Sequence, residues 1–232
     1  CISIEGDVFS FGKQTQEAHG HKNEIVPSPK KIPSLKNISS LSCGNYHALC
    51  LDFEGNVFSF GANKVGQLGV GKSSAILYSA HEPQKINLPP IKQLSCGLNF
   101  SVCLSMEGRL FSFGSAFYGQ LGLGLDNSNQ NSPQLIDCLN DIEYVECGHY
   151  HTICKSYNHD FYCWGRNEGR LGIGNTASQY TPVKCSNWPK DIVDVKCGEY
   201  HTLVLTSNHE VFSCGNSDFG QLGREYPEYY LT

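Results

Sequence analysis

Residues 41–50 read Leu-Ser-Cys-Gly-Asn-Tyr-His-Ala-Leu-Cys, and this stretch returns three times in related form. The copies are Leu-Ser-Cys-Gly-Leu-Asn-Phe-Ser-Val-Cys at 94–103, Val-Glu-Cys-Gly-His-Tyr-His-Thr-Ile-Cys at 145–154 and Val-Lys-Cys-Gly-Glu-Tyr-His-Thr-Leu-Val at 195–204. A period of about fifty residues indicates one supersecondary unit repeated along or around an axis. Function must then be sought on the faces and loops of the repeats.

Two further landmarks keep the same period. Phe-Gly or an equivalent pair ends at Gly12, Gly61, Gly114, Gly165 and Gly215. Gly-Gln-Leu-Gly follows at 66–69, 119–122 and 220–223, with Gly-Arg-Leu-Gly at 169–172, whereas residues 13–21 lack this motif. We therefore predict a single partial domain over 1–232. Its repeats are 1–40 (partial, with a degenerate loop), 41–93, 94–144, 145–194 and 195–232 (partial).

One repeat is predicted to contain four short strands. They are Ile91–Cys96, Phe100–Leu104, Arg109–Phe113 and Ser132–Ile136, and the loop 114–124 is too rich in glycine for a helix. Four antiparallel strands per repeat without an amphipathic helix are typical of a β-propeller blade, so the predicted fold class is all-β. The leucines of the Gly-x-Leu-Gly motifs are expected to fill the gaps between blades; they are Leu68, Leu121, Leu171 and Leu222.

These motifs resemble the repeats of the regulator of chromosome condensation family. The residues that carry the resemblance are Cys-Gly-x-x-His-Thr, Gly-x-Val-Phe-Ser-Phe-Gly and Gly-Gln-Leu-Gly-x-Gly, and it covers essentially the whole chain. The resemblance implies a seven-bladed propeller, of which about four and a half repeats are present. We expect a piece of a longer propeller, because an isolated partial one leaves raw strand edges; the alternative is an unusual smaller propeller.

Composition restricts the classes of function. The net charge of −5 gives no reason to expect strong attraction to nucleic acid. No run of eighteen apolar residues predicts a membrane span. The chain has twelve cysteines, four of which, Cys43, Cys96, Cys147 and Cys197, recur at one apolar repeat position. A small buried side chain explains this better than disulfide pairing. We expect a reduced, intracellular protein, either cytoplasmic or nuclear.

Two apparent motifs are interpreted as products of the repeat. Residues 66–73 satisfy the phosphate-binding pattern G-x-x-x-x-G-K-S, but the glycines belong to the repeat and no helix is predicted to follow, so no nucleotide site is assigned. Cys-x3-His-x2-Cys occurs at 43–50 and 147–154. Because Phe100 replaces the histidine and Val204 the last cysteine in other copies, we assign no metal and no cofactor.

The turn after Cys-Gly carries the candidate site. The simpler interpretation is that its histidines fasten the turn by bonding to backbone and its tyrosines pack over it. The resemblance implies another, since the family's exchange factor for the small GTPase Ran uses acidic and histidine side chains of this turn. The matching positions here are 45–47, 98–100, 149–151 and 199–201, with Glu199 as the one acid. The candidate partner-binding residues are Tyr46, His47, His149, Tyr150, His151, Glu199, Tyr200 and His201.

The predicted function is that of a protein–protein interaction module whose blade-face loops bind a protein partner. The alternative is a guanine nucleotide exchange factor for Ran or another small GTPase, which needs no nucleophile and no acid–base pair. No repeat carries a long insertion like the wedge of the family's exchange factor, which weakens the alternative. Chromatin binding is a third hypothesis, but no basic tail supports it.

Overall fold

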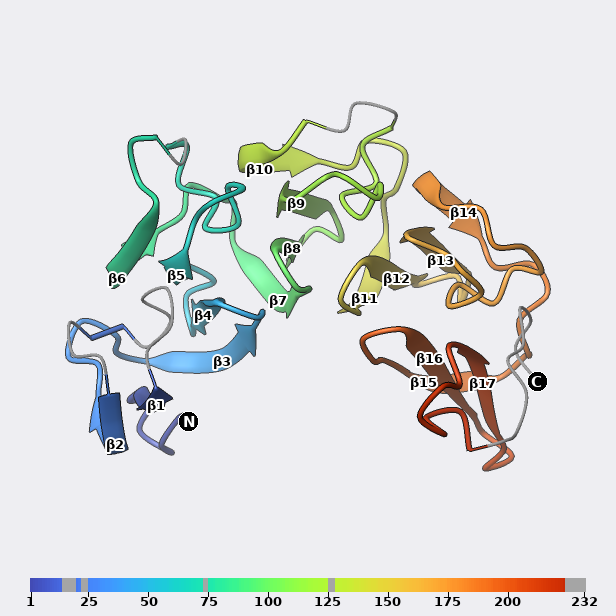
Figure 1. Ribbon diagram of the computed structural model, residues 1–232, viewed down its shortest axis with the longest axis horizontal. Helices are drawn as coiled ribbons and strands as arrows, with labels where there is room; N and C mark the ends of the chain where they lie inside the picture. Colours follow the sequence, from blue (N-terminus) through green and yellow to red (C-terminus); the bar gives the residue numbers. More distant parts are fainter. Residues whose placement is uncertain (14–19, 22–24, 73–74, 125–127, 224–232) are drawn as a thin grey trace.

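The computed structural model describes residues 1–13, 20–21, 25–72, 75–124 and 128–223. The described part of the chain contains seventeen β-strands and no helix. The strands form five antiparallel sheets that follow one another along an arc (Figure 1), and the first and last sheets do not close the ring. The prediction of an all-β, incomplete β-propeller is confirmed. No helix capable of crossing a membrane occurs within these ranges.

Each of the three complete sheets has four strands, and the first strand of each lies nearest the centre of the arc. The first sheet is β1 (Phe9–Lys13) and β2 (Ile25–Lys31), and the second is β3 (Ile38–Cys43), β4 (His47–Asp52), β5 (Val57–Ala62) and β6 (Ser79–Lys85). The third is β7 (Ile91–Cys96), β8 (Phe100–Ser105), β9 (Leu110–Gly114) and β10 (Gln130–Leu135). The fourth is β11 (Ile142–Cys147), β12 (His151–Ser156), β13 (Phe161–Gly165) and β14 (Gln179–Lys184). The fifth is β15 (Ile192–Cys197), β16 (His201–Thr206) and β17 (Val211–Gly215).

The same irregularity marks the first hairpin of four sheets. The pairing of the first two strands shifts between Ile38 and Ser40, and it shifts at the corresponding positions in the other three sheets, after Ile91, Ile142 and Ile192. A bulge bends a strand and increases its local twist. The first strand of each of these four sheets is therefore bent at the corresponding position, so the blades have a similar shape around the axis.

The hydrophobic core lies between sheets. One cluster joins Phe100 and Leu110 of the third sheet to Val145 and Trp164 of the fourth, and Leu121 belongs to it. A second cluster joins the fourth sheet to the fifth and contains Leu171. Both faces of a sheet within the arc carry apolar side chains that must be buried, and the adjacent sheets bury them. Each blade is therefore stabilised by its neighbour. The predicted position of these leucines between blades is confirmed for Leu121 and Leu171.

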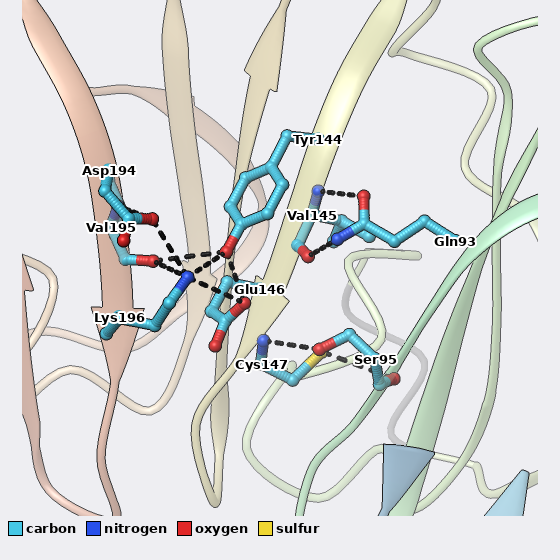
Figure 2. Close-up of polar contacts among 9 residues, drawn as sticks. All are labelled: Gln93, Ser95, Tyr144, Val145, Glu146, Cys147, Asp194, Val195 and Lys196. Carbon is cyan, nitrogen blue, oxygen red and sulfur yellow. Dashed lines mark hydrogen bonds and ion pairs between the residues drawn. The ribbon is translucent and has the colours of Figure 1, made fainter. Parts of the chain in front are cut away.

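Side chains join the inner strands where no backbone ladder connects them. Figure 2 shows the side-chain amide of Gln93 paired with the backbone of Val145, with Nε2 donating to the carbonyl at 2.8 Å and the backbone N–H donating to Oε1 at 3.1 Å. One step further, the N–H of Cys147 donates to Ser95 Oγ at 2.9 Å. Between β11 and β15, Lys196 Nζ donates to the Tyr144 hydroxyl at 2.8 Å. The inner strands of the blades are thus fixed to one another as well as to their own sheets.

Candidate protein-binding face

The turns between the first and second strands of four sheets meet at one end of the arc's axis. We call the surface made by these turns and the glycine-rich loops beside them the turn face. Its turns are 44–47, 97–100, 148–151 and 198–201, and its loops are 62–72, 115–124, 166–174 and 216–223. The turns surround an axial pocket of about 390 Å³ that is lined by the four Cys-Gly pairs and by Asn45, Leu98, His149 and Glu199. The fold therefore brings the predicted turns together.

Hydrogen bonds link successive turns around this pocket. The N–H of Asn45 donates to the carbonyl of Leu98 at 3.1 Å, and the N–H of Leu98 donates to the carbonyl of His149 at 3.0 Å. At the next step His149 Nδ1 lies 3.2 Å from a carboxylate oxygen of Glu199. Backbone bonds fix the first three turns, whereas the fourth is joined through an ion pair that exists when His149 is protonated.

His47 and His151 lie inside the blade-to-blade contacts, where they are 2% and 0% exposed. His47 Nε2 is 2.9 Å from Ser101 Oγ, and His151 Nε2 is 3.1 Å from Thr202 Oγ1. In turn, each hydroxyl donates to a carbonyl of the previous blade, Ser101 to Gln67 and Thr202 to Arg170. These rings therefore present no surface to a partner, and in this structure they fasten one blade to the next.

Burial keeps both histidines neutral. Desolvation lowers the pKa of His47 to about 4, and desolvation reinforced by the charge of Arg170 lowers the pKa of His151 to about 3. An imidazolium at either position would be a charge buried without a counter-ion. The folded state therefore binds fewer protons than the unfolded chain below the ordinary histidine pKa of about 6.5.

We expect the free energy of unfolding to fall as the pH is lowered. The folded-state pKa values lie below the unfolded ones, so the stabilisation is complete above pH ~6.5 and is lost as the unfolded histidines become protonated. Each histidine accounts for about 2 kcal/mol between pH 7 and pH 5. Urea unfolding of the wild type at the two pH values measures the sum.

The matched variant is His47→Phe, because the third sheet already carries Phe100, fully buried, at this position. The variant should lose the share of the pH dependence due to His47 while remaining folded. An undiminished pH dependence in His47→Phe would show that other groups cause it.

The half-buried candidates His149, Tyr150 and Tyr200 form a cluster of rings on the turn face. Tyr150 contacts Tyr118 of the neighbouring loop edge-on, with ring centroids 5.2 Å apart, and stacks with Tyr200 at 6.4 Å. The ring of His149, in the third turn, faces the fourth turn; its centroid is 6.1 Å from that of Tyr150 and 6.3 Å from that of Tyr200. Phe117, two-thirds exposed, extends the cluster through Tyr118. The blade contacts of three sheets thus contribute to one aromatic surface.

Two arginines that were not among the predicted residues complete the cluster. The guanidinium of Arg166 lies over the rings of Tyr118 and Tyr150, 4.6 and 5.7 Å from their centroids. That of Arg170 lies 5.1 Å from the ring of Tyr200, and Glu168 accepts hydrogen bonds from both arginines. A signal was present in the sequence, because Arg170 replaces the glutamine of the other Gly-Gln-Leu-Gly motifs.

The remaining candidates lie at the edges of this surface. Tyr46 is half-buried in the first of the four turns, and among the described residues it makes no ring contact with the cluster. Glu199 is exposed beside the axial pocket, and its hydrogen bond with Tyr200 raises the pKa of that phenol. His201 is half-buried in the fifth sheet, where desolvation lowers its pKa.

Gly66 and Gly69 of the phosphate-binding pattern allow close approach between blades, whereas its Ser73 lies outside the described residues. A Cβ at Gly66 would lie 2.5 Å from the carbonyl oxygen of Gln130, and one at Gly69 would lie 2.7 Å from the ring of Phe113. Within the described ranges, no three histidine, cysteine or acidic side chains lie where they could hold a metal ion.

Comparison with known sequences agrees with this architecture. The profile of the regulator of chromosome condensation (RCC1) repeat matches residues 5–51, 54–104, 107–154 and 158–205. The chain belongs to this repeat family. Among its relatives in the family, human protein RCC2 is 39% identical over 130 residues, which are 54% of this chain and 24% of RCC2. The human probable E3 ubiquitin-protein ligase HERC6 is 35% identical over 175 residues, 72% of this chain and 17% of HERC6. The chain spans a quarter or less of these two relatives.

Solved structures of RCC1-like propellers share the fold. The structure of human WBSCR16 aligns with a TM-score of 0.84 at 22% identity and covers 97% of this chain and 61% of that one. Prp20p from Saccharomyces cerevisiae aligns with a TM-score of 0.65 at 22% identity and covers 98% and 71%. Likeness at this identity identifies the architecture, so the role of the turn face is argued from its own residues.

Proposed function

We propose that this chain is a protein-interaction module and that its turn face binds a protein partner. The observation that carries the proposal is the continuous cluster of Tyr118, Tyr150, Tyr200 and Arg166 on that face. Tyrosine and arginine are enriched among the residues that dominate binding energy at protein interfaces. They supply apolar contact area together with polar groups that can bond across an interface.

Two solved structures with the same fold support the proposal that the ligand is a protein. The structure of Prp20p is reported with its binding properties to Gsp1p and histones, and another structure has Kap60 bound to yeast RCC1. These partners belong to those proteins. For the present chain they favour a macromolecular ligand over a small molecule.

Affinity capture with matched variants tests the proposal. Tyr150→Ser removes the ring at the centre of the cluster, whereas Phe53→Ser removes an exposed ring from the hairpin after β4, at the other end of the blades. The amount of a turn-face partner that is captured should fall at least tenfold with Tyr150→Ser and stay the same with Phe53→Ser. If every captured protein is retained by Tyr150→Ser, the turn face is not the binding surface.

Guanine nucleotide exchange on Ran or another small GTPase is a second candidate. The observation that favours it is the position of Glu199, an exposed acid beside the axial pocket and next to His149. Exchange needs only contacts that loosen the phosphates and magnesium of the bound nucleotide. The wild type should accelerate the release of a fluorescent GDP analogue from Ran. Glu199→Gln should abolish this acceleration, and Glu143→Gln should leave it unchanged. Equal release with and without the protein, over a panel of small GTPases, would eliminate this candidate.

We further propose that the protein functions inside the cell, in the cytoplasm or nucleus. The described cysteines form no disulfide, and burial raises the pKa of Cys96 to about 12, which keeps it as an unreactive thiol. Localisation of the tagged full-length protein tests this, and secretion into the medium would contradict it. Chromatin binding remains a weaker proposal, because the net charge of −5 does not favour attraction to DNA.

A further inference from the structure

One glycine-rich loop of the turn face is a residue shorter than its counterparts. Four residues separate the glycine that ends the third strand from the Gly-x-Leu-Gly motif in the loops 62–65, 115–118 and 216–219. Only three, residues 166–168, do so in the loop after β13. Glu168 directly precedes the motif in this short loop, where the other loops have Val65, Tyr118 or Phe219.

The neighbouring blade contact shows what an aromatic residue before the motif does. Tyr118 places its ring against Tyr150 of the next blade. The contact one blade further on is built in the same way, because Thr152 donates to the carbonyl of Gln120 and Thr202 donates to the carbonyl of Arg170. Tyr200 is therefore the counterpart of Tyr150, and the loop beside it has Glu168 before its motif where the preceding loop has Tyr118.

A pocket of about 380 Å³ lies beside Tyr200. Arg166, Glu168 and Arg170 line it on one side and the loop 215–218 lines it on the other. The volume falls within the range of about 300–1,000 Å³ that is usual for ligand pockets. The pocket thus lies where the equivalent contact has an aromatic side chain.

Arg170, which lines this pocket, has a buried donor. Its side chain is 2% exposed; Nε donates to the carbonyl of Asn167 at 2.8 Å and Nη2 to Glu168 at 2.5 Å. Nη1 has no hydrogen-bond partner among the described residues. A buried donor without an acceptor is costly, so an oxygen that comes within hydrogen-bond distance of Nη1 would be bound there preferentially.

We propose that this pocket receives a tyrosine side chain from a protein partner. Its ring would pack on Tyr200 beside the two guanidinium groups, as Tyr118 packs on Tyr150 beneath Arg166. Its hydroxyl oxygen would accept a hydrogen bond from Nη1 of Arg170. Aromatic pairing and cation–π attraction favour the ring, and the unpaired donor favours tyrosine over phenylalanine. This inference rests on the proposed protein-binding function and specifies the anchor that the partner supplies.

Titration with p-cresol, the side-chain analogue of tyrosine, tests the pocket without a known partner. NMR of the full chain with labelled arginine side chains and aromatic rings should show saturable shifts at Arg170 and Tyr200. Toluene, the phenylalanine analogue, should bind about tenfold more weakly. Arg170→Gln, which restores the residue of the other loops, should remove this preference. Glu107→Gln, in the hairpin after β8, is the control and should bind as the wild type does.

Two variants close or remove the pocket by different means. Insertion of one tyrosine between Glu168 and Gly169 restores the usual loop length and should reduce p-cresol binding more than tenfold. Tyr200→Ala removes the ring on which the ligand packs and should do the same without altering the loop. The proposal is overturned if p-cresol produces no saturable shift at Arg170, or if it binds both variants as tightly as the wild type.

The two proposals can fail separately. A partner that requires Tyr150 but binds Tyr200→Ala at full strength would sustain the proposed function and overturn the tyrosine pocket. Binding of p-cresol at Arg170 together with no partner that requires Tyr150 would overturn the proposed function and sustain the pocket.

Discussion

Replacement of Gly165 by alanine is expected to lower the free energy of unfolding by about 4 kcal/mol or more. Gly165 has a φ of 101°, a backbone conformation that residues with a Cβ rarely adopt. A Cβ would also lie 2.4 Å from the carbonyl oxygen of Tyr150 and 2.8 Å from the Cα of His151. Because Gly165 pairs with His151 across β12 and β13, the backbone cannot withdraw without breaking the ladder. Urea unfolding followed by circular dichroism measures the loss.

Gly124→Ala separates the two causes of this loss. Gly124 has nearly the same φ, 102°, but nothing lies within 4 Å of the position its Cβ would take. We expect a cost of about 1–2 kcal/mol there, due to backbone strain alone. Equal losses in the two variants would mean that the close approach to Tyr150 contributes nothing.

Trp164→Ala is expected to cost about 3–5 kcal/mol. The ring is fully buried in the cluster between the third and fourth sheets, and its Nε1 donates to the carbonyl of Gln120 at 3.0 Å. Truncation would empty a large part of this blade contact. Equilibrium unfolding by circular dichroism is the measurement, because fluorescence would lose one of the two tryptophans.

Trp164→Phe is the matched variant. It retains most of the apolar ring and removes the N–H, and Gln120 still accepts a hydrogen bond from Thr152. A loss of about 1–2 kcal/mol is expected. If alanine and phenylalanine cost the same, the hydrogen bond and not the packing would account for the stability that Trp164 provides.

The repeat period predicted much of the fold. The strand expected at Ile91–Cys96 has the same bounds as β7, and those expected at Phe100–Leu104, Arg109–Phe113 and Ser132–Ile136 correspond to β8–β10 with ends that differ by at most two residues. Strand positions follow from alternation and turn residues, which are local properties. The bulges after Ile38, Ile91, Ile142 and Ile192 were not foreseen, because they are set by the register between the first and second strands of each sheet, which the pattern of a single strand does not contain.

The candidate site was less accessible from the sequence. The turns were located from their Cys-Gly motif, and the aromatic residues Tyr150 and Tyr200 do lie together. The burial of His47 and His151 could not be read from the motif, since it depends on hydroxyl groups more than fifty residues away in the chain. Arg166 could not be assigned to the cluster for a similar reason, because its partner Tyr118 comes from another repeat and Tyr150 from a separate turn of its own repeat.

The short loop after β13 also breaks the rotational symmetry of the blades. Repeats that are alike would let a ligand bind in several orientations about the axis with similar affinity. The contact between Arg170 and Tyr200 differs from its neighbours in shape and in charge. A protein that recognises this contact is restricted to a single orientation on the arc, so the loss of one residue gives a repetitive scaffold a defined docking direction.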